Sequence, residues 1–389
     1  MKKKIGVLTY HHVMNEGAIL QAYSQFHALQ DHLADVDVEI IDYRMKCKDT
    51  EEFKNLFLKR LRKFDFQAVK RYMKLKRFIN QELPLSRRRL KSDDYGKAIR
   101  FIGDEYSAIV VGSDEVWKSI CDGDRIIRPF PNIYWLSPNL DCKKVAMAAS
   151  ANRCDYNKIS KRNKKVGRKL LQEFDFIGVR DQHTVEFVRS LGVKKEVQKV
   201  PDPAFSFDLT KDYDEAIKEK LKRRGVDLNR PVLCFRTGGT EERNKLCKAA
   251  ERYFRDKGYQ TVSIGGPNRY ADHNLSDMFD PFEWAHVYKF FDFCITDRFH
   301  GTVFCLKNGI PFLSIEDDDY YKRIKSKIVD LLEDFEMMNH YLYLDGSDYD
   351  IEQILSDIED SFSAKEVRKK VDLMRGQYHE MLETIGEII

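Results

Sequence analysis

Short apolar runs alternate along the chain with stretches of helical periodicity. Residues 5–10 form the first run, and after a polar loop Ile19, Tyr23 and Phe26 recur at three- and four-residue spacing. This spacing places the apolar side chains on one face of a helix, whereas the short run is typical of a buried strand. Residues 38–43 form the next apolar run. The order strand, helix, strand predicts a βαβ unit with parallel strands.

The same alternation continues along the chain in two series. The further runs that predict strands are residues 106–111, 145–150, 177–179, 231–235, 259–264, 291–296 and 310–315. Pro201 and Pro203 exclude regular structure between the two series and mark a linker. The pattern therefore predicts an α/β protein with two Rossmann-like domains that face a central cleft. This is the GT-B-like architecture of many sugar-transferring enzymes.

The two series define the expected domains. We expect an N-terminal Rossmann-like domain over residues 1–205 and a C-terminal one over residues 206–345. Residues 346–389 form a C-terminal helical segment. Its later part carries apolar residues at helical spacing, beginning with Val367 and Val371, and we expect this amphipathic helix to pack back across a domain.

The composition is that of a soluble globular protein. Hydrophobic residues make up 42% of the 389, and 67 Lys and Arg nearly balance 63 Asp and Glu, so the net charge of +4 identifies no partner. The first apolar stretch is too short for a signal peptide, and no run approaches the roughly 18 apolar residues of a spanning helix. Eight cysteines without a CxxC pair indicate reduced thiols. We therefore expect a cytoplasmic protein.

Positive charge is concentrated between residues 51 and 91, which we expect to form a helical basic segment. Within residues 54–91, 14 Lys and Arg oppose only Asp65 and Glu82, so this stretch carries +12 and the remainder of the chain −8. One interpretation is a solvated pair of helices that covers the N-terminal sheet. Another is a peripheral contact with the anionic inner face of a membrane, because apolar residues alternate with the cations. Nucleic acid is not expected, because no recognition motif accompanies the charge.

Polar residues that could bind a ligand or catalyse a reaction follow the predicted strand at residues 291–296. Asp297, Arg298 and His300 come directly after it and precede the next predicted helix. Carboxyl ends of parallel strands and amino ends of the following helices favour anions, so Arg298 and His300 form a candidate cationic site. A buried structural histidine is the alternative interpretation of His300.

Two other strand ends carry candidate residues. Asp114 follows the strand at residues 106–111, and Arg180 follows the strand at residues 177–179. Both residues occupy positions from which side chains reach ligands rather than the core. For Arg180, a surface position or an ion pair with Asp181 is the alternative.

Asn15 and Gly17 precede the first predicted helix, where the same geometry favours a ligand, although a plain helix entry also uses such residues. An acidic run at residues 316–319 precedes another predicted helix. Carboxylates there suit the helix dipole, so a helix cap explains the run better than a metal does. We expect no metal site.

Five motifs in order carry a resemblance to a known family. They are residues 15–23 (NEGAILQAY), residues 109–117 (IVVGSDEVW), residues 178–181 (GVRD), Asp202-Pro203 and residues 295–302 (ITDRFHGT). Together they resemble the polysaccharide pyruvyl transferase family over roughly residues 5–315. The basic segment at residues 51–91 departs from the family's motifs.

The resemblance implies transfer of pyruvate from phosphoenolpyruvate to two hydroxyls of a sugar in a polysaccharide or lipid-linked oligosaccharide precursor, which forms a cyclic ketal. Phosphoenolpyruvate is then the donor substrate, and no cofactor is implied. Its carboxylate and phosphate need planar cationic donors, and protonation of its methylene carbon needs an acid that titrates near neutral pH. The expected site residues are Arg180, Arg298 and Gly301 for phosphoenolpyruvate, Asn15, Gly17 and Ser113 for the acceptor, and His300 and Asp114 for catalysis.

Other functions fit the same residues. A nucleotide-sugar-dependent glycosyltransferase of this architecture is the main alternative, because fold does not determine function and basic strand-end residues also bind diphosphates. A ligand-binding protein without catalytic activity is a third. Stabilisation by phosphoenolpyruvate or by a nucleotide sugar would separate these hypotheses.

Overall fold

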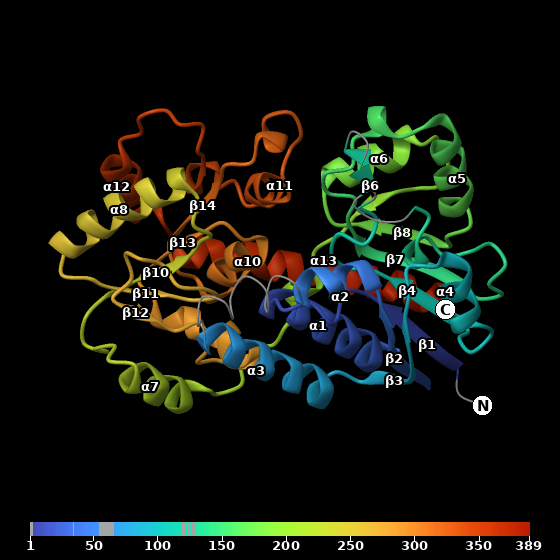
Figure 1. Cartoon of the computed structure of the whole chain (residues 1–389), viewed down its shortest axis with the longest axis horizontal. Helices are drawn as coiled ribbons and strands as arrows, with labels where there is room; N and C mark the ends of the chain where they lie inside the picture. The colour runs from blue at the N-terminus through green and yellow to red at the C-terminus, as the bar shows by residue number, and fades with distance from the viewer. Residues whose placement is uncertain (1–2, 34, 54–65, 119–120, 123–124, 127–129) are drawn as a thin grey trace. The chain divides into compact units, whose positions relative to one another are not determined.

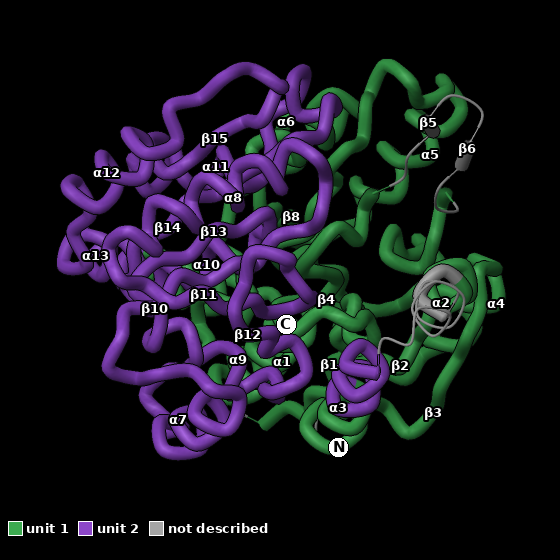
Figure 2. The backbone as a smooth tube through the Cα atoms, turned by 60° about the vertical axis from the view of Figure 1, so that its left-hand side comes forward, with its two compact units in different colours: residues 1–62, 76–207, 374–389 green, residues 63–75, 208–373 purple. Residues whose placement is uncertain are grey.

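The computed structural model describes residues 3–33, 35–53, 66–118, 121–122, 125–126 and 130–389. The chain divides into two compact units (Figure 2). Unit 1 comprises residues 1–62, 76–207 and 374–389, and unit 2 comprises residues 63–75 and 208–373. Each unit contains its own parallel β-sheet with helices packed on it (Figure 1).

The sheet of unit 1 has seven parallel strands in the order β3-β2-β1-β4-β7-β8-β9. These strands are β1 (Lys3–Leu8), β2 (Val36–Arg44), β3 (Leu85–Lys91), β4 (Ala108–Val111), β7 (Lys143–Ala149), β8 (Phe176–Val179) and β9 (Gln198–Lys199). Strands β4 and β8 are buried at every position, as expected of parallel strands that are covered on both faces. A separate antiparallel pair is formed by β5 (Cys121–Asp122) and β6 (Arg125–Ile126). The helices of unit 1 are α1 (Glu16–His32), α2 (Lys46–Phe53), α4 (Tyr95–Ile102), α5 (Lys161–Leu171) and α6 (Gln182–Ser190).

The sheet of unit 2 has six parallel strands in the order β12-β11-β10-β13-β14-β15. These strands are β10 (Val232–Arg236), β11 (Gln260–Ser263), β12 (His273–Asn274), β13 (Phe293–Thr296), β14 (Phe312–Glu316) and β15 (Tyr341–Tyr343). Its helices are α7 (Asp214–Arg223), α8 (Glu241–Asp256), α9 (Pro281–His286), α10 (Phe299–Asn308), α11 (Lys327–Asp334) and α12 (Ile351–Ser361). Two helices contribute to both units, α3 (Phe66–Glu82) and α13 (Ala364–Ile388). The predicted α/β fold with two Rossmann-like domains is confirmed.

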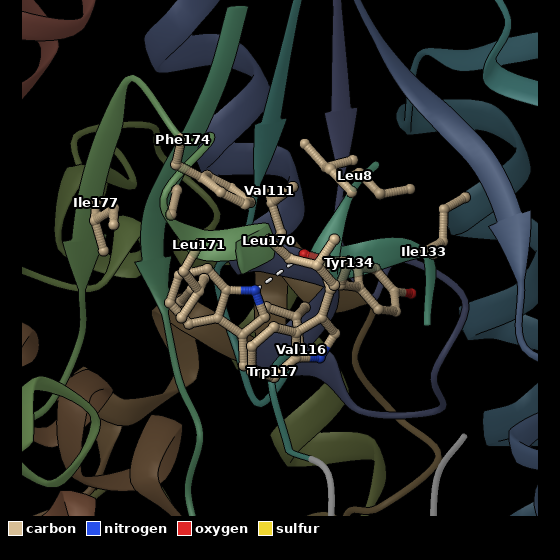
Figure 3. Close-up of a cluster of buried hydrophobic side chains, with 14 of the residues drawn as sticks. Leu8, Val111, Val116, Trp117, Ile133, Tyr134, Leu170, Leu171, Phe174 and Ile177 are labelled. Carbon is tan, nitrogen blue, oxygen red and sulfur yellow. Dashed lines mark hydrogen bonds between the residues drawn. The ribbon is translucent and has the colours of Figure 1, made fainter. Parts of the chain in front are cut away.

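A cluster of aromatic side chains fixes the loop that follows β4. The ring centroid of Trp117 lies 5.7 Å from those of Trp135 and Phe174, and its Nε1 donates a 2.9 Å hydrogen bond to the carbonyl oxygen of Tyr134 (Figure 3). Trp117 is fully buried. A buried tryptophan with a satisfied N–H is a strong anchor, so the backbone that carries Asp114 is held firmly against the core.

The prediction of helical structure over residues 51–91 is wrong for residues 85–91. Residues 54–65 lie outside the described residues, and α3 ends at Glu82. Pro84 cannot continue a helix, and Leu85–Lys91 instead forms β3 at the edge of the unit 1 sheet, paired with β2. Charged side chains are common on edge strands, because they discourage pairing with another chain. This explains the run of three arginines at residues 87–89.

The remaining predictions about the whole chain have simple outcomes. None of the helices in the described part of the chain has the length and apolar character needed to cross a bilayer. The seven cysteines whose side chains are described are free thiols. The predicted C-terminal helix is present as α13, and its residues 374–388 belong to unit 1.

Candidate functional site

The carboxyl ends of three neighbouring strands of unit 2 bring polar residues to one edge of the sheet. Strand β10 ends at Arg236, β11 leads to Gly265, and β13 leads to Asp297 and Arg298. Strands β11, β10 and β13 are adjacent and parallel. This edge is the usual ligand-binding position in an open α/β sheet.

Asp297 organises the edge. Its Oδ2 accepts a 2.7 Å hydrogen bond from the backbone N–H of Gly238 and another from Nη1 of Arg243, while Oδ1 lies 2.9 Å from Nε of Arg298. Arg243 reaches across from α8 and also pairs with Asp317 after β14. The Asp297 side chain is almost fully buried. One carboxylate therefore fixes the positions of two guanidinium groups.

Glycines make room for this arrangement. A Cβ atom on Gly265 would lie 2.3 Å from Cζ of Arg236, so the Arg236 guanidinium lies directly over the Gly265 backbone. Gly265 also has a φ of 79°, which side chains rarely adopt. A Cβ atom on Gly238 would lie 3.0 Å from Nη1 of Arg243. Gly265 thus needs glycine for Arg236 to occupy its place, whereas a side chain at Gly238 would only crowd the end of Arg243.

The arginines bring positive charge close together, although Asp297 and Asp317 neutralise part of it. Loss of surrounding water lowers the pKa of Arg298, Asp297 opposes this change, and the like charges of Arg236, Arg243 and Arg71 lower the pKa further. A guanidinium nevertheless keeps its charge in proteins. The lowered pKa therefore reflects loss of water first and the neighbouring positive charges second, and an anionic ligand would relieve the second effect. About half of the Arg298 side chain (52%) is exposed, so this residue can meet such a ligand.

His300 and Gly301 lie in the first turn of α10, which begins at Phe299. His300 is buried, and its ring packs edge-on against Phe299 with centroids 5.4 Å apart. A Cβ atom on Gly301 would lie 2.2 Å from Oγ1 of Thr296, so only glycine allows α10 to approach β13 this closely. Arg298, His300 and Gly301 therefore lie together at this turn, and their contacts with a substrate stay a prediction.

A second cluster in unit 1 contains Asp114 and Arg180. Nη1 of Arg180 lies 2.8 Å from Oδ2 of Asp202, and Nη2 lies 3.4 Å from Oδ1 of Asp114. The Arg180 side chain is only 2% exposed. Burial alone would lower the pKa of Arg180, but the surrounding carboxylates raise it. Arg180 is therefore a buried cation with two carboxylate partners, one of which is Asp114.

Ser113 belongs to the same cluster. Its Oγ lies 3.0 Å from the carbonyl oxygen of Ala148 and 3.2 Å from Oδ2 of Asp202, and its backbone N–H donates to Oε1 of Gln25. Ser113 is fully buried, and the next residue, Asp114, has a φ of 72°. These contacts fix the backbone turn that directs the Asp114 carboxylate.

Asn15 and Gly17 lie at the start of α1 in unit 1. The Asn15 side chain is the N-cap and accepts a 3.1 Å hydrogen bond from the backbone N–H of Gly17. This is the plain helix entry that the sequence also allowed, and a contact with the acceptor stays a prediction.

In the acidic run at residues 316–319, Asp318 caps a short 3-10 helix and Asp317 pairs with Arg243.

Sequence reasoning missed four residues of these clusters. Arg236 was visible as the residue directly after a predicted strand, and Asp297 and Asp202 stood within the motifs without an assigned role. Arg243 gave no signal, because it lies within a charged helix 54 residues from its partner Asp297. Only the order of the strands in the sheet brings it to this edge.

Solved structures of low sequence identity share the fold. The UDP-GlcNAc 2-epimerase from Methanocaldococcus jannaschii is 11% identical, with a TM-score of 0.53 over 96% of this chain and 99% of its own. The Anabaena protein Alr3699/HepE, in complex with UDP and glucose, is 11% identical, with a TM-score of 0.52 over 99% of this chain and 98% of its own. These likenesses support the GT-B-like fold.

Sequence comparisons give a more specific result. A search of curated proteins finds no match. A model of the polysaccharide pyruvyl transferase family matches residues 15–320, which include all five motifs. The chain therefore belongs to the polysaccharide pyruvyl transferase family.

Proposed function

We propose that this pyruvyl transferase uses phosphoenolpyruvate as its donor and joins pyruvate to two hydroxyls of a sugar as a cyclic ketal. The observation that carries the proposal is the positive edge of the unit 2 sheet, where Arg298 lies two residues before His300. Phosphoenolpyruvate carries two anionic groups around the carbon that must react. A cationic edge with an adjacent histidine suits both features.

Arg298 is the direct donor to the anionic groups in this proposal. Its Nε pairs with Oδ1 of Asp297, while about half of the side chain is exposed. The guanidinium is therefore oriented before the substrate arrives. Arg236 and Arg243 add positive potential at the same edge. Preorganised charge of this kind stabilises an anionic ligand without reorganisation during the reaction.

His300 supplies the proton in the first step. One sugar hydroxyl attacks C2 of the enol, the methylene carbon takes a proton from His300 and becomes a methyl group, and the hydroxyl proton passes to a base. A second hydroxyl then attacks the same carbon and closes the ketal, while the C–O bond to phosphate breaks and the phosphate leaves with the proton of that hydroxyl as hydrogen phosphate. The products are the ketal and inorganic phosphate, and no cofactor is consumed.

Asp114 is the proposed base or orienting group for the acceptor. Arg180 and Ser113 were predicted as substrate contacts, and their burial with Asp202 supports a role in holding Asp114 in position. The proposed acceptor is a sugar of a polysaccharide or lipid-linked precursor. Because phosphoenolpyruvate is a metabolite of the cytoplasm, the proposed donor implies a cytoplasmic reaction.

Thermal-shift titration with phosphoenolpyruvate and with a panel of nucleotide sugars tests the donor. A ligand that binds the folded protein alone at 100 times its Kd stabilises it by about 2.7 kcal/mol, so phosphoenolpyruvate should raise the melting temperature. Stabilisation by a nucleotide sugar and not by phosphoenolpyruvate would favour a glycosyltransferase instead. That alternative has one supporting observation, since the structurally similar Anabaena protein was solved with UDP and glucose.

A further inference from the structure

Helix α3 carries a mixed apolar and basic stripe on its exposed face. The stripe consists of Phe66, Lys70, Met73 and Arg77, spaced by four, three and four residues, which places them on one side of the helix. All four are exposed, with Phe66 65% and Met73 60% accessible. We call these four residues the α3 stripe.

The other side of α3 is attached to the protein. Leu75 is fully buried. Nζ of Lys74 donates a 2.9 Å hydrogen bond to the carbonyl oxygen of Asp277, and Nδ2 of Asn274 donates to Oε1 of Gln67. These contacts fix the rotation of the helix about its axis, so the α3 stripe is presented outward by the packing of the opposite face.

The charge of α3 is strongly one-sided. The helix contains five Lys and Arg, and Glu82 at its end is the single acidic residue. Exposed basic residues in such a helix attract an anionic partner. The large exposed apolar side chains of the described residues are Phe66, Met73, Met338 and Leu373. Two of these four alternate with cations on the α3 stripe.

We propose that the α3 stripe docks the protein on the surface of an anionic lipid bilayer. Phe66 and Met73 would enter the boundary between headgroups and acyl chains, while Lys70 and Arg77 stay at the level of the lipid phosphates. A nucleic acid could pair with the cations and stack a base on Phe66, but it offers no apolar layer that would take Met73 out of water. The bilayer is therefore the occupant that matches both kinds of residue.

Strand β3 was the other basic candidate, and its contacts make it a weaker one. Arg89 pairs with the buried Asp42 at 2.6 Å, and Arg88 lies 3.4 Å from Glu105. Their charges are partly neutralised within the protein. The α3 stripe, rather than the arginines of β3, is thus the proposed contact surface.

Vesicle co-sedimentation of the full chain tests the charged part of the proposal. Binding to phosphatidylcholine vesicles should rise as phosphatidylserine is added and fall with salt. Because each cation at the surface contributes about 1 kcal/mol, K70Q/R77Q should lower the partition coefficient by on the order of 10-fold or more. The matched variant R88Q/R89Q removes the same charge from the two β3 arginines that pair with Glu105 and Asp42, so it should have a much smaller effect. Equal losses in the two variants, or binding that ignores lipid charge, would overturn the proposal.

A second pair of variants tests the apolar part. F66S/M73S should weaken vesicle binding even at low salt, whereas M338S/L373S, which removes two exposed apolar side chains elsewhere, should bind as the parent does. If F66S/M73S binds normally, the surface is a simple polyanion site and bilayer docking is wrong. All four side chains are exposed, so both variants should keep the parental melting temperature, and loss of binding can be separated from unfolding.

Discussion

Arg180 and Asp202 form a buried ion pair, with 2.8 Å between Nη1 and Oδ2 and with both side chains almost inaccessible to solvent. The pair links the end of β8 to the first residues after the sheet, where Asp202 also caps the short 3-10 helix at Pro203–Ser206. Through its second nitrogen, Arg180 reaches Asp114. The ion pair therefore connects the stability of unit 1 to the position of a candidate catalytic carboxylate.

Removing one partner of this pair should be costly. In Asp202→Asn the charge of Arg180 stays buried and loses its closest carboxylate, which typically costs about 3–5 kcal/mol. Urea unfolding should show a loss of this size, and turnover should also fall because Asp114 is no longer held. Asp360→Asn, on an exposed surface of α12, is the matched control and should change stability by less than about 0.5 kcal/mol. Similar stabilities of the two variants would show that the pair is not important.

His300→Gln separates catalysis from binding. If His300 protonates the methylene carbon, this variant should keep its affinity for phosphoenolpyruvate and lose turnover by on the order of 100-fold or more. Titration calorimetry gives the affinity, and phosphate release in the presence of acceptor gives the turnover. The exposed His379 provides a control in His379→Gln, which should behave as the parent. Near-normal turnover of His300→Gln would remove this residue from the mechanism.

Arg298→Lys tests the anion contact. Lysine keeps the charge but cannot bind two oxygens with a planar fork, and hydrogen bonds to charged groups contribute about 1.5–3 kcal/mol. The dissociation constant for phosphoenolpyruvate should therefore rise by on the order of 10-fold. Arg223→Lys, in an exposed ion pair on α7, is the control. Unchanged affinity of Arg298→Lys would show that the donor is bound elsewhere.

The sequence predicted the architecture well because the fold follows from local patterns. Buried strands appear as apolar runs in the sequence. The polar turn at Arg298 and His300 indicates the start of α10. The same local reading treated residues 85–91 as helix, since their charge resembled that of α3, although pairing with β2 makes them a strand.

The electrostatic contacts of the site were harder to predict. Arg243 pairs with Asp297 because β10 and β13 are neighbours in the sheet, and strand order cannot be read from spacing in the sequence. The burial of Arg180 depends in the same way on Asp202, 22 residues further along the chain. Sequence motifs therefore identified where ligands could bind but not which charges were already neutralised by partners.

Gly265→Ala should weaken donor binding through Arg236. The new Cβ would lie 2.3 Å from Cζ of Arg236, so the guanidinium must move. The substitution also costs about 1–2 kcal/mol for a side chain at positive φ. Gly258→Ala is a precise control, since Gly258 has a φ of 86° and no atom within 4 Å of the added Cβ. Both variants should lose similar stability, but only Gly265→Ala should bind phosphoenolpyruvate more weakly. Equal affinities would mean that Arg236 does not contribute to the site.

Buried His12 should make the protein less stable in mild acid. Burial, together with the neighbouring His11, Lys48 and Arg44, lowers the pKa of His12 well below its usual value. Neither Asp42 nor the Asp49 carboxylate, whose Oδ1 lies 3.3 Å from Nε2 of His12, offsets this. In the unfolded chain His12 titrates near pH 6.5. Below that pH the unfolded state binds a proton that the folded state does not, so the free energy of unfolding falls by up to about 1.4 kcal/mol per pH unit. Above pH 6.5, His12 is neutral in both states and does not change the free energy of unfolding.

In urea unfolding between about pH 7 and pH 5, His12→Gln should therefore lose less stability than the parent, whereas His379→Gln should lose as much. Parallel pH profiles of His12→Gln and the parent would show that His12 takes up its proton in the folded protein.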